Sequence, residues 1–153
     1  MVVRLLAVIV GIALAAGLMA AQATAAVVPE FSRSQVRIGQ LVTVFQPGGL
    51  SWLSEDARPI RIYLVRARQL GLVIGRPGTR KVGPPPSTLA RYVGTWSRNG
   101  RLTFRIRRVQ PGRYAAVAWC VPCGGTLIGS FPGSVPDDAY VRRDGSLLRI
   151  LAS

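Results

Sequence analysis

Short runs of alternating apolar and polar residues make up the chain after residue 26, and glycine, proline, Asn-Gly or Asp-Gly ends most of them. Alternation with a period of two is typical of a half-buried β-strand, and β-branched residues favour that state. Runs spaced roughly every 8 to 15 residues, without a helical period of useful length, predict an all-β, antiparallel fold of about seven strands. The runs are Gln35–Phe45, Ile60–Val65, Tyr92–Ser97, Arg101–Arg107, Arg113–Cys120, Thr126–Phe131, Tyr140–Arg143 and Ser146–Leu151.

Two turns and one connection are predicted in more detail. Asn99-Gly100 separates two alternating runs, which predicts a β-hairpin with a type I′ turn. Asp144-Gly145 is the turn of a second candidate hairpin near the end of the chain. Residues 67–87 hold several glycines and a proline triplet, so we expect a long surface connection, partly extended.

The first residues have the features of an export signal. Arg4 precedes an uncharged apolar run from Leu5 to Ala20, and small residues follow at the positions that signal peptidase recognises. We predict a signal peptide over residues 1–25, cleaved after Ala23 or Ala25, and a single domain over residues 26–153. The apolar run is shorter than the roughly 20 residues of a spanning helix, which favours cleavage. An uncleaved membrane anchor is the alternative, because about 17 residues can still span a membrane.

The chain is strongly basic. It carries 20 Lys and Arg against 6 Asp and Glu, a formal net charge of +14, and Lys81 is its one lysine. The guanidinium group of arginine binds phosphate through two hydrogen bonds, so the excess of arginine over lysine is typical of phosphate recognition. A genome rich in G and C is the alternative explanation of the same excess. With either explanation the surface is basic and attracts anions. An exported protein meets envelope polymers or lipid headgroups before it meets nucleic acid. We therefore expect anionic envelope polymers or lipid headgroups as partners, and no nucleic acid. The candidate anion-contacting residues are Arg105, Arg107, Arg108, Arg142 and Arg143.

The chain contains no histidine. This excludes catalytic triads, Cys-His pairs and most zinc and copper sites, so no cofactor is predicted. The carboxylate pairs Glu55-Asp56 and Asp137-Asp138 are interpreted as turn residues, with a glycosidase-like pair as the alternative. Trp52, Trp96 and Trp119 are interpreted as core or half-core residues, with a sugar-stacking platform as the alternative.

The two cysteines lie together after the most apolar run. Trp119-Cys120-Val121-Pro122-Cys123 resembles the active-site motif of thioredoxins, which implies Cys120 as nucleophile and Cys123 as resolving thiol. That chemistry needs a helix after the first cysteine to lower the pKa of its thiol, whereas Gly124-Gly125 starts a β-like segment. The preferred interpretation is a local disulfide between Cys120 and Cys123 that closes the strand end. Half of a metal site shared between two chains is a third interpretation.

Several of these segments, taken in order, resemble bacterial extracellular immunoglobulin-like domains and, more distantly, the CopC-like copper-resistance sandwich. The segments are Val36–Val44, Ile60–Val65, Gly94–Trp96, Asn99–Phe104 and Gln110–Tyr114, and the resemblance covers roughly residues 35–131. It implies an antiparallel immunoglobulin-like β-sandwich. CopC-like copper sites use histidine and methionine, whereas this chain has only Met1 and Met19, both in the predicted signal, so those ligands do not carry over.

These observations favour a secreted or envelope-associated, basic, non-catalytic binding or structural module. The alternative is an exported thiol–disulfide oxidoreductase that uses Cys120 and Cys123. No specific small-molecule ligand is identified from the sequence.

Overall fold

The computed structural model describes residues 29–54, 59–75, 81–129 and 147–153. The predicted signal peptide, the run Tyr140–Arg143 and the Asp144-Gly145 turn lie outside these residues. The mostly β fold predicted from the alternating runs is confirmed. The strands are β1 (Glu30–Phe31), β2 (Gln35–Arg37), β3 (Leu41–Phe45), β4 (Arg61–Arg66), β5 (Ala90–Thr95), β6 (Arg101–Arg105), β7 (Gly112–Cys120), β8 (Thr126–Gly129) and β9 (Leu147–Leu151).

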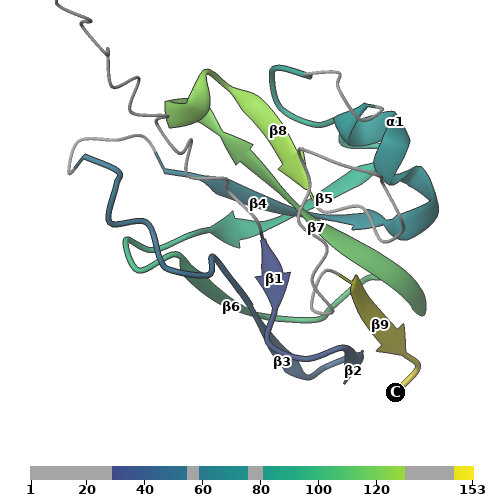
Figure 1. Ribbon diagram of the computed structural model, residues 1–153. Coiled ribbons are helices and arrows are strands. Elements are labelled where there is room, and N and C mark those ends of the chain that lie inside the picture. The colour runs from purple at the N-terminus through teal and green to yellow at the C-terminus, as the bar shows by residue number, and fades with distance from the viewer. Residues whose placement is uncertain (1–28, 55–58, 76–80, 130–146) are drawn as a thin grey trace, which may run out of the picture.

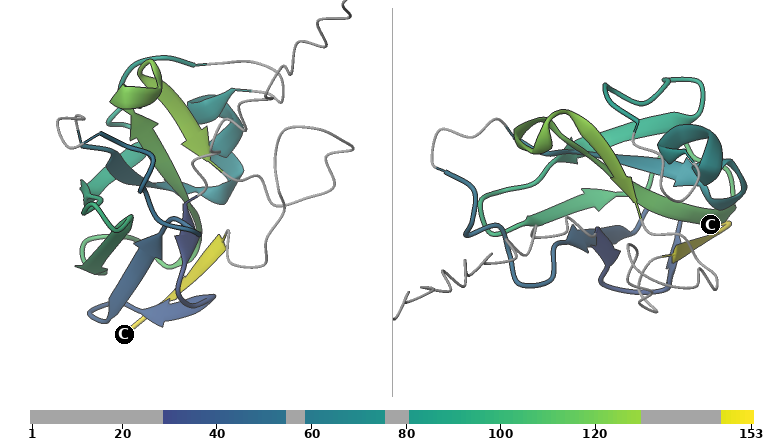
Figure 2. Two further views of the ribbon diagram at one scale, coloured as in Figure 1. Left: turned by 60° about the vertical axis from the view of Figure 1, so that its left-hand side comes forward. Right: turned by 45° about the horizontal axis from the view of Figure 1, so that its top comes forward.

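The strands form two sheets, which Figures 1 and 2 show from three directions. A three-stranded antiparallel sheet has the order β1-β3-β6. A six-stranded sheet has the order β2-β9-β7-β4-β5. Its sixth strand, β8, pairs with the Cys120 end of β7, whereas β9 pairs with the Gly112 end. The β2–β9 pair is parallel, so the prediction of a wholly antiparallel arrangement is wrong for this pair.

The main hydrophobic core contains residues from both sheets. Val42 and Val44 of β3 are buried on one side, and Ile62 and Leu64 of β4 are buried on the other. Leu41, Thr43 and Phe45 alternate with the buried valines, as the period of two in this run predicts. Burying such β-branched and aliphatic side chains stabilises the fold by about 1.5–3 kcal/mol each, relative to leaving them exposed.

A second core covers the opposite face of the six-stranded sheet. After β4 the chain forms a short 3-10 turn, η1 (Ala67–Gln69), and a single-turn helix, α1 (Leu70–Ile74). Leu70, Val73 and Ile74 are buried with the β4 and β7 residues that face away from the main core. The prediction of a surface connection without a helix is therefore wrong for these residues. The apolar residues among the glycines pack onto the sheet, and this tertiary contact outweighs the poor helix propensity of Gly71, Val73 and Ile74.

The predicted Asn99-Gly100 hairpin is wrong. A local turn does form, because Gly100 donates a backbone hydrogen bond to Ser97 at 2.8 Å. However, β5 pairs with β4 and β6 pairs with β3, so the turn carries the chain from one sheet to the other. Trp96 explains the crossing: its side chain is buried in the main core, and its Nε1 donates to the backbone oxygen of Val44 at 3.0 Å.

Candidate functional site

The predicted disulfide is present. Cys120 and Cys123 are bonded, with their Cα atoms 5.1 Å apart. Cys120 is the last residue of β7, and Cys123 ends a single 3-10 turn, η2 (Val121–Cys123). The bridge therefore closes the end of the central strand of the six-stranded sheet.

The backbone after the cysteines does not form the α-helix that thioredoxin-like chemistry needs. Gly124 and Gly125 have φ angles of 76° and 73°, a conformation that residues with a Cβ rarely adopt, and β8 begins at once. Trp119 fixes this turn, because its Nε1 donates to the Gly125 oxygen at 3.0 Å. The guanidinium of Arg61 lies 5.3 Å from the centre of the Trp119 ring, within the range of a cation–π contact.

The two sulfur-bearing residues differ in exposure. Cys120 is 0% exposed and belongs to the main core, whereas Cys123 is half-buried. A nucleophilic thiol has to be reached by its substrate. Cys120, which the thioredoxin-like motif implies as the nucleophile, is therefore the buried cysteine of the pair.

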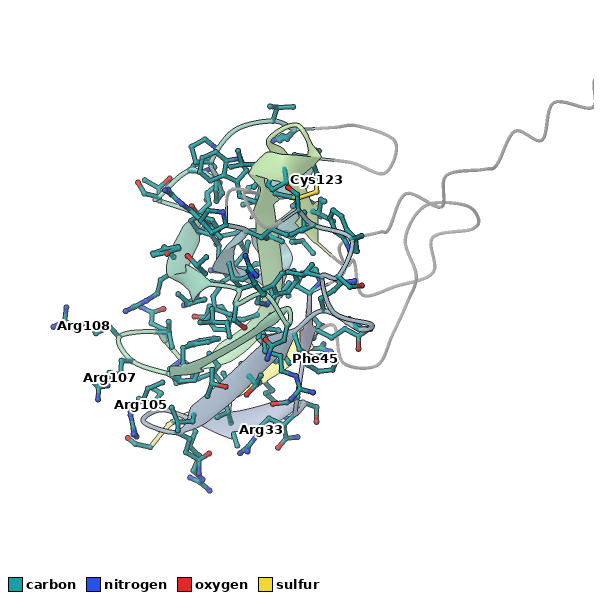
Figure 3. All side chains as sticks on the ribbon, turned by 90° about the vertical axis from the view of Figure 1, so that its left-hand side faces the viewer. Arg33, Phe45, Arg105, Arg107, Arg108 and Cys123 are labelled. Carbon is teal, nitrogen blue, oxygen red and sulfur yellow. A yellow bond between two sulfur atoms is a disulfide. The ribbon has the colours of Figure 1, made fainter. Side chains whose placement is uncertain are left out.

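The predicted arginines lie at the other end of β7. Arg105 ends β6, and Arg107 and Arg108 lie in the loop between β6 and β7, both exposed. Figure 3 shows the side chains of these three arginines pointing outward on one side of the molecule, far from Cys123. Arg142 and Arg143 lie outside the described residues. The cysteine pair and this arginine loop are therefore separate features rather than one site.

Two further arginines, which the sequence did not single out, hold this loop. Arg91 of β5 donates from Nη1 to the backbone oxygen of Arg108. Arg66, at the end of β4, donates from Nη2 to Oε1 of Gln110 and lies 5.9 Å from the centre of the Tyr114 ring. The Tyr114 hydroxyl donates to the Gln110 backbone oxygen at 2.8 Å. We call Arg66, Arg91, Arg105, Arg107 and Arg108 the loop arginine cluster.

Carboxylates are scarce beside these cations. Among the described residues Glu30 is the sole Asp or Glu, and its side chain is only 8% exposed. The pairs Glu55-Asp56 and Asp137-Asp138 lie outside those residues, as does any glycosidase-like arrangement of them. In the part of the chain that the structure describes, no group of three His, Cys, Asp or Glu could hold a metal ion.

The three tryptophans do not share a surface. Trp96 lies in the main core, and Trp119 packs against the second core, on the opposite face of the six-stranded sheet. Trp52 is 42% exposed in the loop after β3. The core or half-core interpretation is therefore confirmed for Trp96 and Trp119 and is wrong for Trp52.

Comparison of the chain with known protein families, with characterised proteins and with solved structures finds no match. Within residues 29–54, 59–75, 81–129 and 147–153, no helix is long and apolar enough to cross a membrane. The function is therefore inferred from the two ends of β7.

Proposed function

We propose that the chain is a secreted or envelope-associated, non-catalytic binding module built on an immunoglobulin-like β-sandwich. Anionic envelope polymers or lipid headgroups are its partners in this proposal. The observation that carries it is the charge of the described surface, where arginines are exposed on both sheets and the one acidic side chain is buried. A surface of one sign attracts partners of the other sign over several ångströms of solvent.

The architecture supports this proposal. A main core with residues of two sheets is what a β-sandwich requires, and such domains present their loops and outer faces to partners. The disulfide suits an oxidising compartment outside the cytoplasm. Because Cys120 is covered and no α-helix follows Cys123 among the described residues, the bridge is better suited to holding the strand end than to exchanging with substrates.

Two measurements on the full chain test the proposal. The first is retention on an isolated cell-envelope fraction, which we expect to fall steeply as salt is raised, because screening shortens the reach of charges. The second is turnover of a small disulfide substrate by the reduced protein, which we expect to equal the buffer rate.

A matched variant makes the second measurement decisive. If the wild type shows turnover and Cys120→Ser abolishes it, the oxidoreductase hypothesis replaces the binding module. If envelope retention is absent, or if it is unchanged by salt, the charge argument is wrong. Sequencing the N-terminus of the exported protein separately tests cleavage after Ala23 or Ala25.

A further inference from the structure

The loop arginine cluster concentrates positive charge, and the hydrogen bonds that its arginines make with other described residues do not neutralise it. Arg66 donates to a side-chain amide oxygen, and Arg91 donates to a backbone carbonyl. Arg105 donates from Nη1 to the backbone oxygen of Gly39 at 2.5 Å. These acceptors are neutral, so the hydrogen bonds orient the guanidinium groups without cancelling their charge. Each guanidinium has five N–H donors in a planar fork, and one such hydrogen bond leaves most of them available for a ligand.

The loop that carries Arg107 and Arg108 has a defined backbone conformation. Arg108 has a φ of 52°, and it is the one described residue other than glycine with a positive φ. This conformation costs roughly 1–2 kcal/mol for a residue with a Cβ. Side chains from β4, β5 and β7 hold the loop through Arg66, Arg91 and the Tyr114 hydroxyl. Two neighbouring arginines are therefore presented on a loop that is ordered before any ligand arrives, which reduces the entropy lost on binding.

We propose that the loop arginine cluster binds a linear polyanion that carries phosphate or carboxylate groups at intervals along its length. This inference rests on the proposed function, because it names the surface and the partner chemistry of the same binding module. Both groups present paired oxygens that match the guanidinium fork. Since the arginines come from β4, β5, β6 and the following loop, several groups along one polymer contact the cluster at the same time.

The shape of the cluster favours an extended polymer over a small anion. Arg105, Arg107 and Arg108 point outward from the molecule, so they meet a ligand that passes across them (Figure 3). A lipid surface is less favoured, because peripheral binding draws on apolar side chains beside the basic ones. Five large apolar side chains are exposed in the described ranges, and only two of them lie beside the cluster: Leu41, which pairs with Arg105, and Tyr92, which follows Arg91. The other three lie elsewhere, with Trp52 in the loop after β3, Leu72 on α1 and Val82 near Gly125 at the disulfide end.

The test measures binding of the full chain to inorganic polyphosphate, to poly-glutamate and to anionic phospholipid vesicles over a range of salt concentrations. The variant Arg105→Gln/Arg107→Gln/Arg108→Gln removes three cluster cations. We expect at least a tenfold loss of affinity at low salt, since a basic residue near an anionic surface contributes about fivefold. We also expect the slope of log affinity against log salt to fall by about 1 for each arginine that no longer binds an anionic group.

The matched control removes the same net charge at the other end of the sheets. Arg61, Arg98 and Arg101 lie at the start of β4, in the turn after β5 and at the start of β6. We expect Arg61→Gln/Arg98→Gln/Arg101→Gln to keep most of the affinity. The single variant Arg107→Gln, which leaves the hydrogen bonds of Arg66, Arg91 and Arg105 in place, preserves the test if the triple variant does not fold, and about a fivefold loss is expected for it.

Each outcome decides the question. Loss in the cluster variant with retention in the control supports the site, and the tighter of the two polymers identifies the anionic group. Equal loss in both triple variants overturns the site, although the proposed function stands because overall charge then drives binding. If the wild type stays on the envelope fraction but binds neither polymer, the inference is wrong and the proposed function again stands. Tighter binding to anionic phospholipid vesicles than to either polymer overturns the polymer class.

Discussion

The two ends of β7 are held in different ways. At the Cys120 end, a covalent bridge and the hydrogen bond from Trp119 to Gly125 fix the turn into β8. At the Gly112 end, the guanidinium groups of Arg66 and Arg91 hold the preceding loop through neutral acceptors. Both ends belong to one nine-residue strand and therefore to the same sheet and core. They differ in the interactions that hold them.

The two ends of β7 therefore differ in what they contribute: the disulfide end contributes to stability, and the arginine end is available for binding. The disulfide end is stabilised by a covalent bond, a hydrogen bond and one cation–π contact from Arg61 to Trp119, and its residues Cys120 and Trp96 are buried. The arginine end keeps exposed like charges close together, which destabilises the free protein slightly but is available to an anionic partner. We therefore expect substitutions at the disulfide end to lower stability and substitutions at the arginine end to lower binding.

The largest effect is expected from Trp96→Ala, near the disulfide end. The side chain is 5% exposed and donates to Val44 across the two sheets. Its removal leaves a cavity and takes away the hydrogen bond to Val44, so the free energy of unfolding should fall by about 3–5 kcal/mol. Denaturant unfolding measures the loss. Trp52→Ala is the matched control, because Trp52 is 42% exposed, and a change within about 0.5 kcal/mol is expected. Similar losses in both variants would contradict the crossing role of Trp96.

The next effect concerns the disulfide itself. Replacing both cysteines in Cys120→Ala/Cys123→Ala opens a very short loop, for which chain entropy predicts a loss of about 2 kcal/mol. Unfolding of the double variant and of the reduced wild type should give similar losses. Affinity for polyphosphate should stay within about twofold of the wild type, because the arginines lie at the other end of β7. A parallel loss of stability and affinity would show that the two ends are coupled.

Most of the strands were predictable from the sequence, because alternation is a local property, but the two-residue strand β1 was missed because it is too short to show alternation. The runs of β3 and β6 alternate in burial along their whole length, and the Gly124-Gly125 exit correctly excluded an α-helix after Cys123. The disulfide was also predictable, since two nearby cysteines in a chain with an export-like start have few other uses.

Strand pairing and the arginine cluster were less predictable, because both depend on interactions between residues far apart in the chain. Asn99-Gly100 carries a strong local hairpin signal, but burial of Trp96 sends the flanking strands to different sheets. Arg66 and Arg91 reach the β6–β7 loop only because β4 and β5 pair across an insertion that contains α1. Nothing in the local pattern around either arginine indicates that partner.

A smaller effect tests the strained loop at the arginine end. At a φ of 52°, Arg108→Gly removes the side chain without a Cβ penalty, whereas Arg108→Ala removes it and keeps the penalty. The glycine variant should therefore be more stable than the alanine variant by about 1 kcal/mol. Both variants should lose the same affinity for polyphosphate, about fivefold, because both lack the guanidinium. A glycine variant that binds much more weakly than the alanine variant would show that loop order, and not only charge, contributes to binding.

The smallest effect is expected from repulsion within the cluster. Arg107 is exposed next to Arg108, so Arg107→Gln should raise stability by a few tenths of a kcal/mol at low salt. Arg101→Gln, at the opposite end of β6, is the matched control and should show a smaller gain. Melting temperatures measured at about 0.01 M and about 1 M salt check this prediction. The Debye length falls from about 30 Å to about 3 Å over this range, so the difference in melting temperature between variant and wild type should vanish at high salt. A gain in stability that persists at high salt would show that packing, and not repulsion, causes it. The contrast between the two ends of β7 would then lose its electrostatic basis.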